Sequence, residues 1–327
     1  MNNVSLAAGK SIWETFEIPQ PAALPYVFRI VNIENTANSS KGVTYAANIF
    51  HEKASLSVCW DSHNVDSKLI PGTLVSMRWL GTKPICVNGR IKISRLVALE
   101  HPVAALNLFD TVPYEWVKDR TLIKRVASVL ENAPVELNFL LNAIFWDSKR
   151  FYRFLVGPSS IKGHHKERNG NFRHSVEVAE IALKLAENKK LVCASVLMMA
   201  ALLHDAGKAD EYTFNYQRGV FEISPRGVLV GHKLTVLEWI AAAKIKCNVN
   251  ISESHYLALI HALTASKGAP AWIGIREPKS LESLILSMAD RLSGQHELFS
   301  KLATETDGFG QYHSHLNGRP FLISEVM

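Results

Sequence analysis

Residues 197–211, LMMAALLHDAGKADE, place an imidazole beside a carboxylate at the expected end of an apolar helix. His204 and Asp205 are adjacent, and Gly207 interrupts the apolar pattern directly after them. Imidazole and carboxylate together suit a divalent ion such as Mn, Fe, Co, Ni or Zn, whereas Mg and Ca prefer sites built from oxygen alone. An isolated His-Asp pair is also common at helix ends on protein surfaces, so further ligands are needed to predict a metal site.

Two more residues supply such ligands. His174 lies upstream, at the start of a predicted helix, and Asp290 lies downstream, inside the apolar helix SLESLILSMADRLSG. Asp290 is flanked by Met288, Ala289 and Leu292, and a carboxylate buried among apolar side chains needs a compensating charge. A metal ion would supply it. The sequence therefore predicts one metal centre, formed by His174, His204, Asp205 and Asp290.

The order of these ligands resembles the HD superfamily of metal-dependent phosphohydrolases. The resemblance extends through GPSSIKGHHKERNGNFRHSVEVAE, ALLHDAGKADEYTF, GVLVGHK and EPKSLESLILSMADRLSG to the YhaM family of 3'-5' exoribonucleases. It covers the chain from about Tyr26 to the C-terminus. It implies an N-terminal OB-fold that presents single-stranded nucleic acid to a helical HD domain with one or two divalent metals, typically manganese.

The resemblance also implies roles for individual residues. It makes the four predicted ligands the core metal site, with Asp205 also catalytic, and puts His232 at a second metal. Lys208 would bind a phosphate oxygen, and His164 and His165 would line the substrate cleft and contact nucleic acid. Independently of the resemblance, the charge of Arg173 makes it a candidate to contact nucleic acid and stabilise the transition state. The alternatives are a core or capping histidine at 232, a solvated lysine at 208, and surface histidines at 164 and 165.

The chain departs from the family pattern before its last helical segment. Where the pattern has Ser-His-His-Gly, this chain has Ala265, Ser266, Lys267 and Gly268. The charge of Lys267 would repel a second cation, although the same lysine is a candidate catalytic residue that stabilises the transition state. His261 is either a substitute ligand or an ordinary helix histidine. One metal is therefore expected, and the second site stays open.

Residues 26–99 should form the small β-domain that the resemblance implies. Segments such as YVFRIVNIE, TYAANIF, SLSVCW, GTLVSMRWLG and RIKISRLVALE give about five short strands separated by turn residues. This pattern favours an OB-type barrel, with another small barrel or sandwich as the alternative. Its aromatic residues would stack bases or fill the core, and its basic residues would follow phosphates. The aromatic candidates are Tyr45, Phe50, Trp60 and Trp79, and the basic candidates are Arg78, Lys83, Arg90 and Lys92.

Beyond about Tyr114 the apolar residues recur at helical spacing almost to the C-terminus. The predicted fold is thus a multidomain α and β protein. It has an N-terminal extension at 1–24, an OB-like β-barrel that binds nucleic acid at 25–102, and an all-α HD domain at 103–327. Only DEYTFNYQRGVFEISPRG interrupts the helical pattern, and it suits a loop or a short hairpin.

Composition limits the cellular setting and the partners. The chain has 327 residues, a formal charge of +6 and a pI near 9.0, which suits a polyanionic partner without proving one. The sequence shows neither an apolar run of the ~20 residues that cross a bilayer nor a signal peptide at its start. We therefore expect a cytoplasmic protein that binds single-stranded nucleic acid and no membrane. A homo-oligomer is left open.

Metal-dependent hydrolysis of phosphodiesters is the leading functional hypothesis, in the form of a 3'-5' exonuclease on single-stranded RNA or DNA. One alternative is a mononuclear HD enzyme that hydrolyses small nucleotides. Another is a catalytically silent HD protein that binds nucleic acid or acts in assembly. A fourth, narrower possibility is a component of a mobile-element or DNA-processing system that uses a related HD fold on DNA.

Overall fold

The computed structural model describes residues 24–38, 42–81, 84–161, 165–302 and 307–323. The chain divides into two compact units. The N-terminal unit comprises the described residues up to His101 together with Leu106–Glu115, and the helical unit comprises Pro102–Ala105 and the described residues from Trp116 onward. The division thus differs from the single boundary expected after residue 102.

Residues 106–115 belong to the N-terminal unit because they bond to its strands. The amide of Glu52 donates a hydrogen bond to the carbonyl of Asp110 at 2.6 Å. The guanidinium of Arg29 is fully buried and donates to Gly72 O at 2.7 Å and to Thr111 Oγ1 at 3.0 Å. Burial lowers the pKa of Arg29 to about 9, so these acceptors offset part of the cost of burying its charge.

Six strands form the N-terminal unit. They are β1 (Phe28–Ala37), β2 (Val43–His51), β3 (Ala54–Ser62), β4 (Leu74–Trp79), β5 (Ile85–Val87) and β6 (Arg90–Ala98). Antiparallel pairs join β1 to β2, β2 to β3, β1 to β4, β4 to β6 and β5 to β6, and a parallel pair joins β3 to β6. Each of β1, β2, β3, β6 and β4 therefore pairs with two others of this group, and the pairings form a closed ring.

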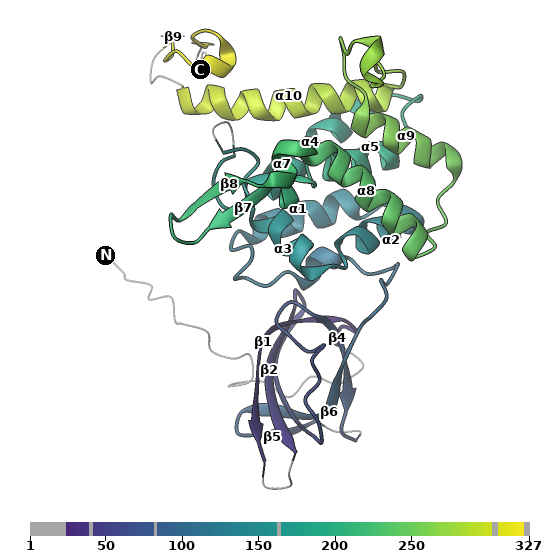
Figure 1. Cartoon of the computed structure of the whole chain (residues 1–327), viewed down its shortest axis with the longest axis vertical. Helices are drawn as coiled ribbons and strands as arrows, with labels where there is room; N and C mark the ends of the chain where they lie inside the picture. The colour runs from purple at the N-terminus through teal and green to yellow at the C-terminus, as the bar shows by residue number, and fades with distance from the viewer. Residues whose placement is uncertain (1–23, 39–41, 82–83, 162–164, 303–306, 324–327) are drawn as a thin grey trace. The chain divides into compact units, whose positions relative to one another are not determined.

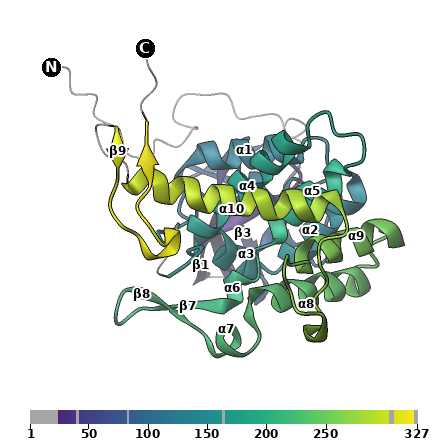
Figure 2. The same cartoon turned by 90° about the horizontal axis from the view of Figure 1, so that it is seen from above.

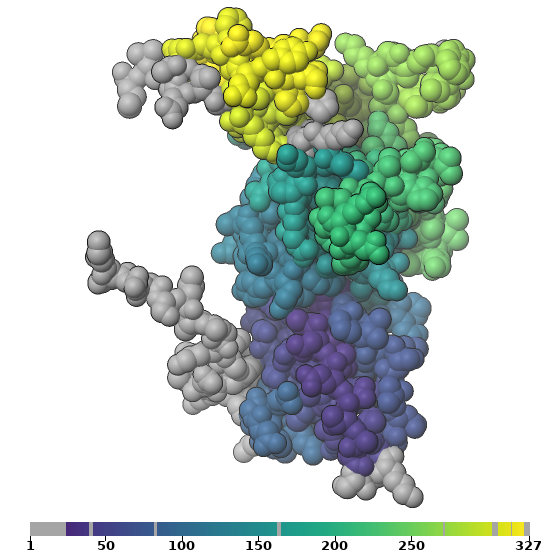
Figure 3. Space-filling view, turned by 60° about the vertical axis from the view of Figure 1, so that its left-hand side comes forward, coloured from purple at the N-terminus to yellow at the C-terminus, as the bar shows by residue number. Residues whose placement is uncertain are grey.

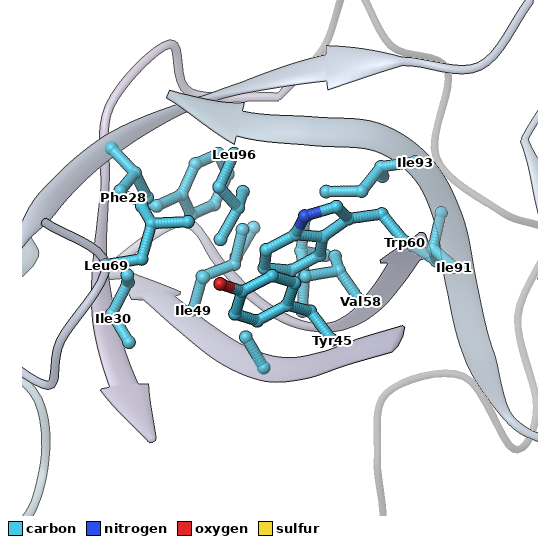
Figure 4. Packing of buried hydrophobic residues seen from close by; sticks show 14 residues of the cluster. Phe28, Ile30, Tyr45, Ile49, Val58, Trp60, Leu69, Ile91, Ile93 and Leu96 are labelled. Atoms are coloured by element: carbon cyan, nitrogen blue, oxygen red, sulfur yellow. The ribbon is translucent and has the colours of Figure 1, made fainter. Parts of the chain in front are cut away.

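Alternate residues of these strands fill the interior of the ring. In β3 the buried positions are Ala54, Leu56, Val58 and Trp60, as the two-residue repeat of a strand requires. The ring of Trp60 stacks on that of Tyr45 (Figure 4), and their centroids are 4.7 Å apart. Both aromatic residues therefore belong to the hydrophobic core.

The helical unit contains ten α-helices within its described residues. They are α1 (Arg120–Leu130), α2 (Val135–Phe145), α3 (Ser148–Val156), α4 (Gly170–Ala186), α5 (Ala194–Leu203), α6 (Lys208–Glu211), α7 (Pro225–Leu229), α8 (Gly231–Lys246), α9 (Glu253–Thr264) and α10 (Leu281–Leu302). Helix α5 is apolar on nearly every face because α4, α9 and α10 pack around it. Figures 1 and 2 show α10 lying across α4 and α5.

The prediction that this domain is all α was wrong. The strands β7 (Tyr212–Asn215) and β8 (Val220–Ile223) form an antiparallel hairpin, and β9 (Gly308–Phe309) pairs with β10 (Phe321–Leu322). The β7–β8 turn forms because Asn215 Oδ1 accepts hydrogen bonds from the amides of Gln217 and Arg218, and Gly219 takes a φ of 67° that a side chain would disfavour. The short hairpin that the sequence suggested at this position is confirmed.

None of the helices in the described part of the chain combines the length and the hydropathy needed to cross a bilayer.

Candidate metal centre

Three helices of the helical unit bring the four predicted ligands together. His174 lies in α4, His204 and Asp205 directly follow α5, and Asp290 lies in α10. His174 Nε2 is 3.3 Å from His204 Nε2 and 3.1 Å from Asp290 Oδ1. Asp205 Oδ2 lies 3.5 Å from both of these imidazole nitrogens. Donor atoms of His174, His204 and Asp290 therefore lie close enough together to share one ion, and Asp205 approaches both imidazoles.

The two imidazoles are held in the form that binds a cation. His204 Nδ1 is 2.7 Å from the carbonyl of Ala201, which can only accept, so this nitrogen carries the proton. His174 Nδ1 lies 3.1 Å from Ser293 Oγ, whose own proton is donated to Glu177, so His174 Nδ1 must be the donor as well. In the neutral rings both Nε2 lone pairs point at each other across 3.3 Å, an arrangement that needs a positive charge between them.

This donor set fits a divalent transition metal. Two ligands bound at ~2.1 Å from one ion lie roughly 3.0–3.4 Å apart. The distances from His174 Nε2 to Asp290, His204 and Asp205 are close to this range, at 3.1, 3.3 and 3.5 Å. His174, His204 and Asp290 form a group of donor atoms that lie within 4.8 Å of one another. Nitrogen and oxygen donors together suit Mn, Fe, Co, Ni or Zn.

Burial and neighbouring charges favour the metal-binding protonation states. Burial lowers the pKa of His204, outweighing the opposite effect of Asp205 and Asp290. For Asp205, burial alone would raise the pKa, but the positive charge of Lys208 and the surrounding imidazoles hold it well below its ordinary value. Burial alone would also raise the pKa of Asp290, but the adjacent imidazoles of His174 and His204 together outweigh it and lower the pKa. The carboxylates are therefore ionised in neutral solution.

Asp205 also contacts Lys208 and His232. Lys208 Nζ lies 2.5 Å from Asp205 Oδ2 and 3.3 Å from Ser159 Oγ. His232 Nε2 lies 3.4 Å from the other oxygen, Oδ1. Glu211 orients His232 by accepting hydrogen bonds from its amide and from Nδ1, at 2.8 and 2.7 Å. The two sides of the Asp205 carboxylate thus face different partners.

Gly207 allows this approach. A Cβ atom at residue 207 would lie 2.1 Å from the carbonyl oxygen of His232, far inside van der Waals contact. The start of α8 can therefore lie against the start of α6 only if residue 207 has no side chain. This contact gives a physical reason for the glycine in the HDAGK sequence.

Sequence reasoning missed the groups that lie behind His174. Ser293 Oγ links His174 Nδ1 to Glu177, and Glu177 Oε2 is also 3.2 Å from His165 Nε2. We call Ser293, Glu177 and His165 the relay. The signal for two of its members was helical spacing, since Glu177 follows His174 by three residues and Ser293 follows Asp290 by three. A ligand histidine is commonly oriented through its second nitrogen in this way.

His165 is buried beside the metal centre, so the alternative of a surface histidine is wrong at this position. Its side chain is buried against the ring of His174, at a centroid separation of 5.4 Å, and its amide donates to Glu297 Oε2 at 2.6 Å. His165, Glu167 and Glu297 also form a second group of potential metal donors. His164 lies outside the described residues. Arg173 is half-buried and faces two carboxylates, at 3.6 Å from Asp119 and 4.0 Å from Glu167.

Two residues predicted to act at the metal centre, His261 and Lys267, have other positions in the structure. His261 Nε2 accepts a hydrogen bond from the amide of Lys279 at 2.9 Å, and Lys267 is exposed. Neither residue offers a donor in the groups found among the described residues. The candidate ligand His261 therefore has a different function in the structure, which is to hold the loop before α10.

The N-terminal candidates divide between core and surface. Trp60 was predicted to contact nucleic acid, but this was wrong because its ring is 2 % exposed and packs inside the ring of strands. Tyr45 and Phe50 are buried as well, and Trp79 is half-buried. Arg78 and Arg90 are exposed. Lys92 pairs with Asp61 at 3.3 Å, and Lys83 lies outside the described residues.

Residues 171–295 match the family model described as the HD domain. The match spans every ligand candidate from His174 to Asp290, so the segment that holds the candidate centre is similar to HD domains. This family consists generally of metal-dependent phosphohydrolases, which agrees with the donor set. No curated protein and no solved structure matches the chain.

Proposed function

Taking residues 171–295 as an HD domain, we propose that this chain hydrolyses phosphodiesters in single-stranded nucleic acid, as a 3'-5' exonuclease that uses a divalent metal, manganese first among the candidates. The observation that carries the proposal is the convergence of two imidazoles and two carboxylates next to the ammonium group of Lys208. His174, His204, Asp205 and Asp290 would hold the metal. When bound, it would polarise a phosphate oxygen and lower the pKa of water enough to supply hydroxide near neutral pH.

The chain's own residues would position and stabilise the substrate. Lys208 is half-buried, and its ammonium group is directed by Asp205 and Ser159, so it is placed to bind a phosphate oxygen beside the metal centre. The relay fixes the ring of His174, and Glu211 fixes the ring of His232. His232 would approach a second metal from the Oδ1 side of Asp205, should one bind.

The ring of strand pairings supports an OB-type domain as the nucleic-acid-binding part of the proposal. The strands pair in the order β1, β2, β3, β6, β4, with β3 and β6 parallel, and this arrangement is compatible with a five-stranded, partly open barrel. Strand β5 pairs with β6 as an additional hairpin. Among the exposed residues, Arg90 lines a cavity of about 210 Å³ with Thr44 and Asn88. We propose that Arg78 and Arg90 contact the phosphates of the bound strand.

A mononuclear enzyme acting on small nucleotides is the second candidate. The observation that favours it is the position of His261 and Lys267, which supply no donor to the groups of potential ligands found among the described residues. The two candidates differ in substrate length. Hydrolysis of mononucleotides or cyclic nucleotides with intact oligonucleotides would favour the second.

Elemental analysis of the purified protein, combined with cleavage of 5'-labelled single-stranded RNA and DNA in added manganese, tests the proposal. We expect a transition metal and products shortened stepwise from the 3' end. Asp205→Asn should lose metal and lower the rate at least about a hundredfold, because it removes a charge that Lys208 and the imidazoles surround. Asp147→Asn is the matched control, since Asp147 caps α3 and asparagine caps equally well. Metal and tight oligonucleotide binding without turnover would instead indicate a silent pocket.

A further inference from the structure

A cavity of about 380 Å³ lies beside the metal centre, within the helical unit. Helix α3, the start of α6 and the β7–β8 hairpin supply its walls, together with Arg168. Its size lies within the range of about 300–1,000 Å³ typical of small-molecule sites. Its lining includes Tyr152, Arg168, Lys208, Tyr212, Phe214 and Phe221.

The hairpin presents its aromatic side chains on one side. Tyr212 and Phe214 are two residues apart in β7, so their side chains point the same way. Tyr216 follows in the turn, and its ring packs edge-on to Phe214 at a centroid separation of 5.1 Å. Phe214 pairs across the hairpin with Phe221, and their ring centroids are 5.0 Å apart. Phe214 is 40 % exposed and Tyr216 is 87 % exposed. Aromatic rings in this setting offer flat faces to a ligand that stacks.

The hairpin is fixed to the helices at its base. Ser224 bonds to Glu211 and Asp210 through its amide and its hydroxyl, at 2.8 and 2.7 Å. Arg153 of α3 donates to the carbonyl of Ala209 and pairs with Asp210. A two-stranded hairpin is marginal alone, so these bonds hold it in position. Figures 1 and 2 both show the hairpin extending beyond the helices, and the corresponding green surface is exposed in Figure 3.

Lys208 connects this cavity to the metal centre. The same side chain lines the cavity and contacts Asp205 Oδ2. A ligand in the cavity therefore lies next to the ammonium group that faces the predicted phosphate position. The cavity combines apolar aromatic walls with three cationic residues, Lys208, Arg168 and Arg153, the last of which pairs with Asp210. This lining suits a molecule that has an aromatic ring at one end and an anion at the other.

We propose that this cavity holds the base of the 3'-terminal nucleotide while its phosphodiester lies at Lys208 and the metal centre. The inference rests on the proposed function and specifies how that site takes its substrate. The base stacks against Phe214 and Tyr216, and Lys208 contacts the adjoining phosphate. Stacking contacts every base by its flat face, so the site accepts all four bases with similar affinity.

The test measures binding of two oligonucleotides to the full-length protein in EDTA, so that no cleavage occurs. One has an ordinary 3'-terminal nucleotide and the other a 3'-terminal abasic nucleotide, both labelled at the 5' end for fluorescence anisotropy. We expect the unmodified protein to bind the abasic strand about tenfold to a hundredfold more weakly, the range that loss of one stacked base gives. Phe214→Ala should remove this difference, and Phe214→Tyr should restore it.

Phe321→Ala is the matched control. Phe321 is also an exposed aromatic residue in a two-stranded sheet, paired with Phe309 at a centroid separation of 4.9 Å, and it does not line the cavity. It should keep the full difference between the two strands. Circular dichroism and metal content of each variant identify any loss of folding, and Tyr216→Ala provides a second cavity variant.

The outcomes separate the two proposals. The cavity assignment is overturned if Phe214→Ala and Tyr216→Ala still bind the ordinary strand more tightly than the abasic strand, by the same factor as the unmodified protein. It is also overturned if the unmodified protein binds both strands equally well, even when it cleaves strands in manganese. The exonuclease proposal is overturned if no strand is cleaved, whereas the binding comparison still decides whether the cavity holds a base.

Discussion

The tautomer of His174 depends on a hydroxyl group. Ser293 Oγ accepts a hydrogen bond from His174 Nδ1 because its own hydroxyl hydrogen is donated to Glu177. Without this acceptor the ring would be free to turn or to place its proton on Nε2, where the metal should bind. The metal centre therefore depends on residues that do not themselves contact the ion.

We expect Ser293→Ala to weaken metal binding about tenfold to a hundredfold, the usual effect of removing such a partner. The measurement is a competition titration with a fluorescent chelator, which reports affinity without reference to activity. Ser300→Ala is the control on the same helix, since the Ser300 hydroxyl donates only to its own helix at His296 O. Equal metal affinity in both variants would show that the relay does not position His174.

His51 should make the stability of the N-terminal unit depend on pH. Burial lowers the pKa of His51 to about 4, and the positive charge of Lys53 contributes while Glu52 opposes the shift. Nδ1 accepts a hydrogen bond from the Lys53 amide at 3.1 Å and so favours the neutral ring. In the unfolded chain this histidine takes up its proton near the ordinary pKa of ~6.5.

Between pH ~6.5 and ~4 the unfolded state binds a proton that the folded state does not. The free energy of unfolding therefore falls by about 1–3 kcal/mol as the pH drops through this window, and the contribution is fully present above it. Urea titrations at several pH values measure the slope. His51→Gln should flatten it, whereas His63→Gln should not, because the side chain of His63 is exposed in the folded protein. An unchanged slope in His51→Gln would contradict the assignment.

At the scale of elements, the junction of α6 and α8 allows no side chain at residue 207. We expect Gly207→Ala to cost about 1–3 kcal/mol of stability and to weaken the contact of His232 with Asp205, because the new Cβ would push against the backbone at His232. Chemical denaturation and metal titration measure the two effects. Gly318→Ala is the control, since its Cβ would meet Leu316 O only at an ordinary 3.7 Å. Equal stability in the two variants would contradict the steric argument.

The elements show what the sequence can predict. The apolar run before His204 predicted a buried helix, and α5 is one, because so continuous a pattern has no polar face to expose. Alternation in the N-terminal segment predicted strands, but it could not tell which face is inside. Trp60 was therefore placed on a binding surface although it stacks on Tyr45 in the core.

The relay could not be predicted for a different reason. The bond between Ser293 and His174 joins α10 to α4 across 119 positions of the chain. Helical spacing places Ser293 on the same face as Asp290, yet only the packing of α10 against α4 determines which residue it meets. The four core ligands could be chosen because their residue types already limit the chemistry. Serine and glutamate are too common on helices to be chosen in this way.

At the scale of the whole molecule, the two units should respond differently to loss of metal. Both groups of potential metal donors found among the described residues lie in the helical unit. A ligand that binds only the folded state stabilises it by about 2.7 kcal/mol when its concentration is a hundred times Kd. Chelation should therefore destabilise the helical unit and leave the N-terminal unit unchanged.

Differential scanning calorimetry before and after dialysis against EDTA measures this effect. We expect one of two transitions to move to lower temperature and to return when manganese is added back. The His51→Gln variant identifies the N-terminal transition, because only that transition should lose its dependence on pH. A scan in which chelation shifts neither transition, or shifts both equally, would contradict a metal confined to the helical unit.

Residues 106–115 belong to the N-terminal unit although Pro102–Ala105 do not, and this limits where recombination could separate the two units. Domains are commonly exchanged between genes at a single exposed linker. In this chain a fusion joined after residue 102 would leave the buried guanidinium of Arg29 without the oxygens of Thr111. A recombination event that keeps the N-terminal unit intact would have to include the coding sequence through Glu115. The transferred segment would then also contain Pro102–Ala105, which belong to the helical unit. A boundary after Glu115, rather than after residue 102, therefore keeps Arg29 and Thr111 in the same transferred segment.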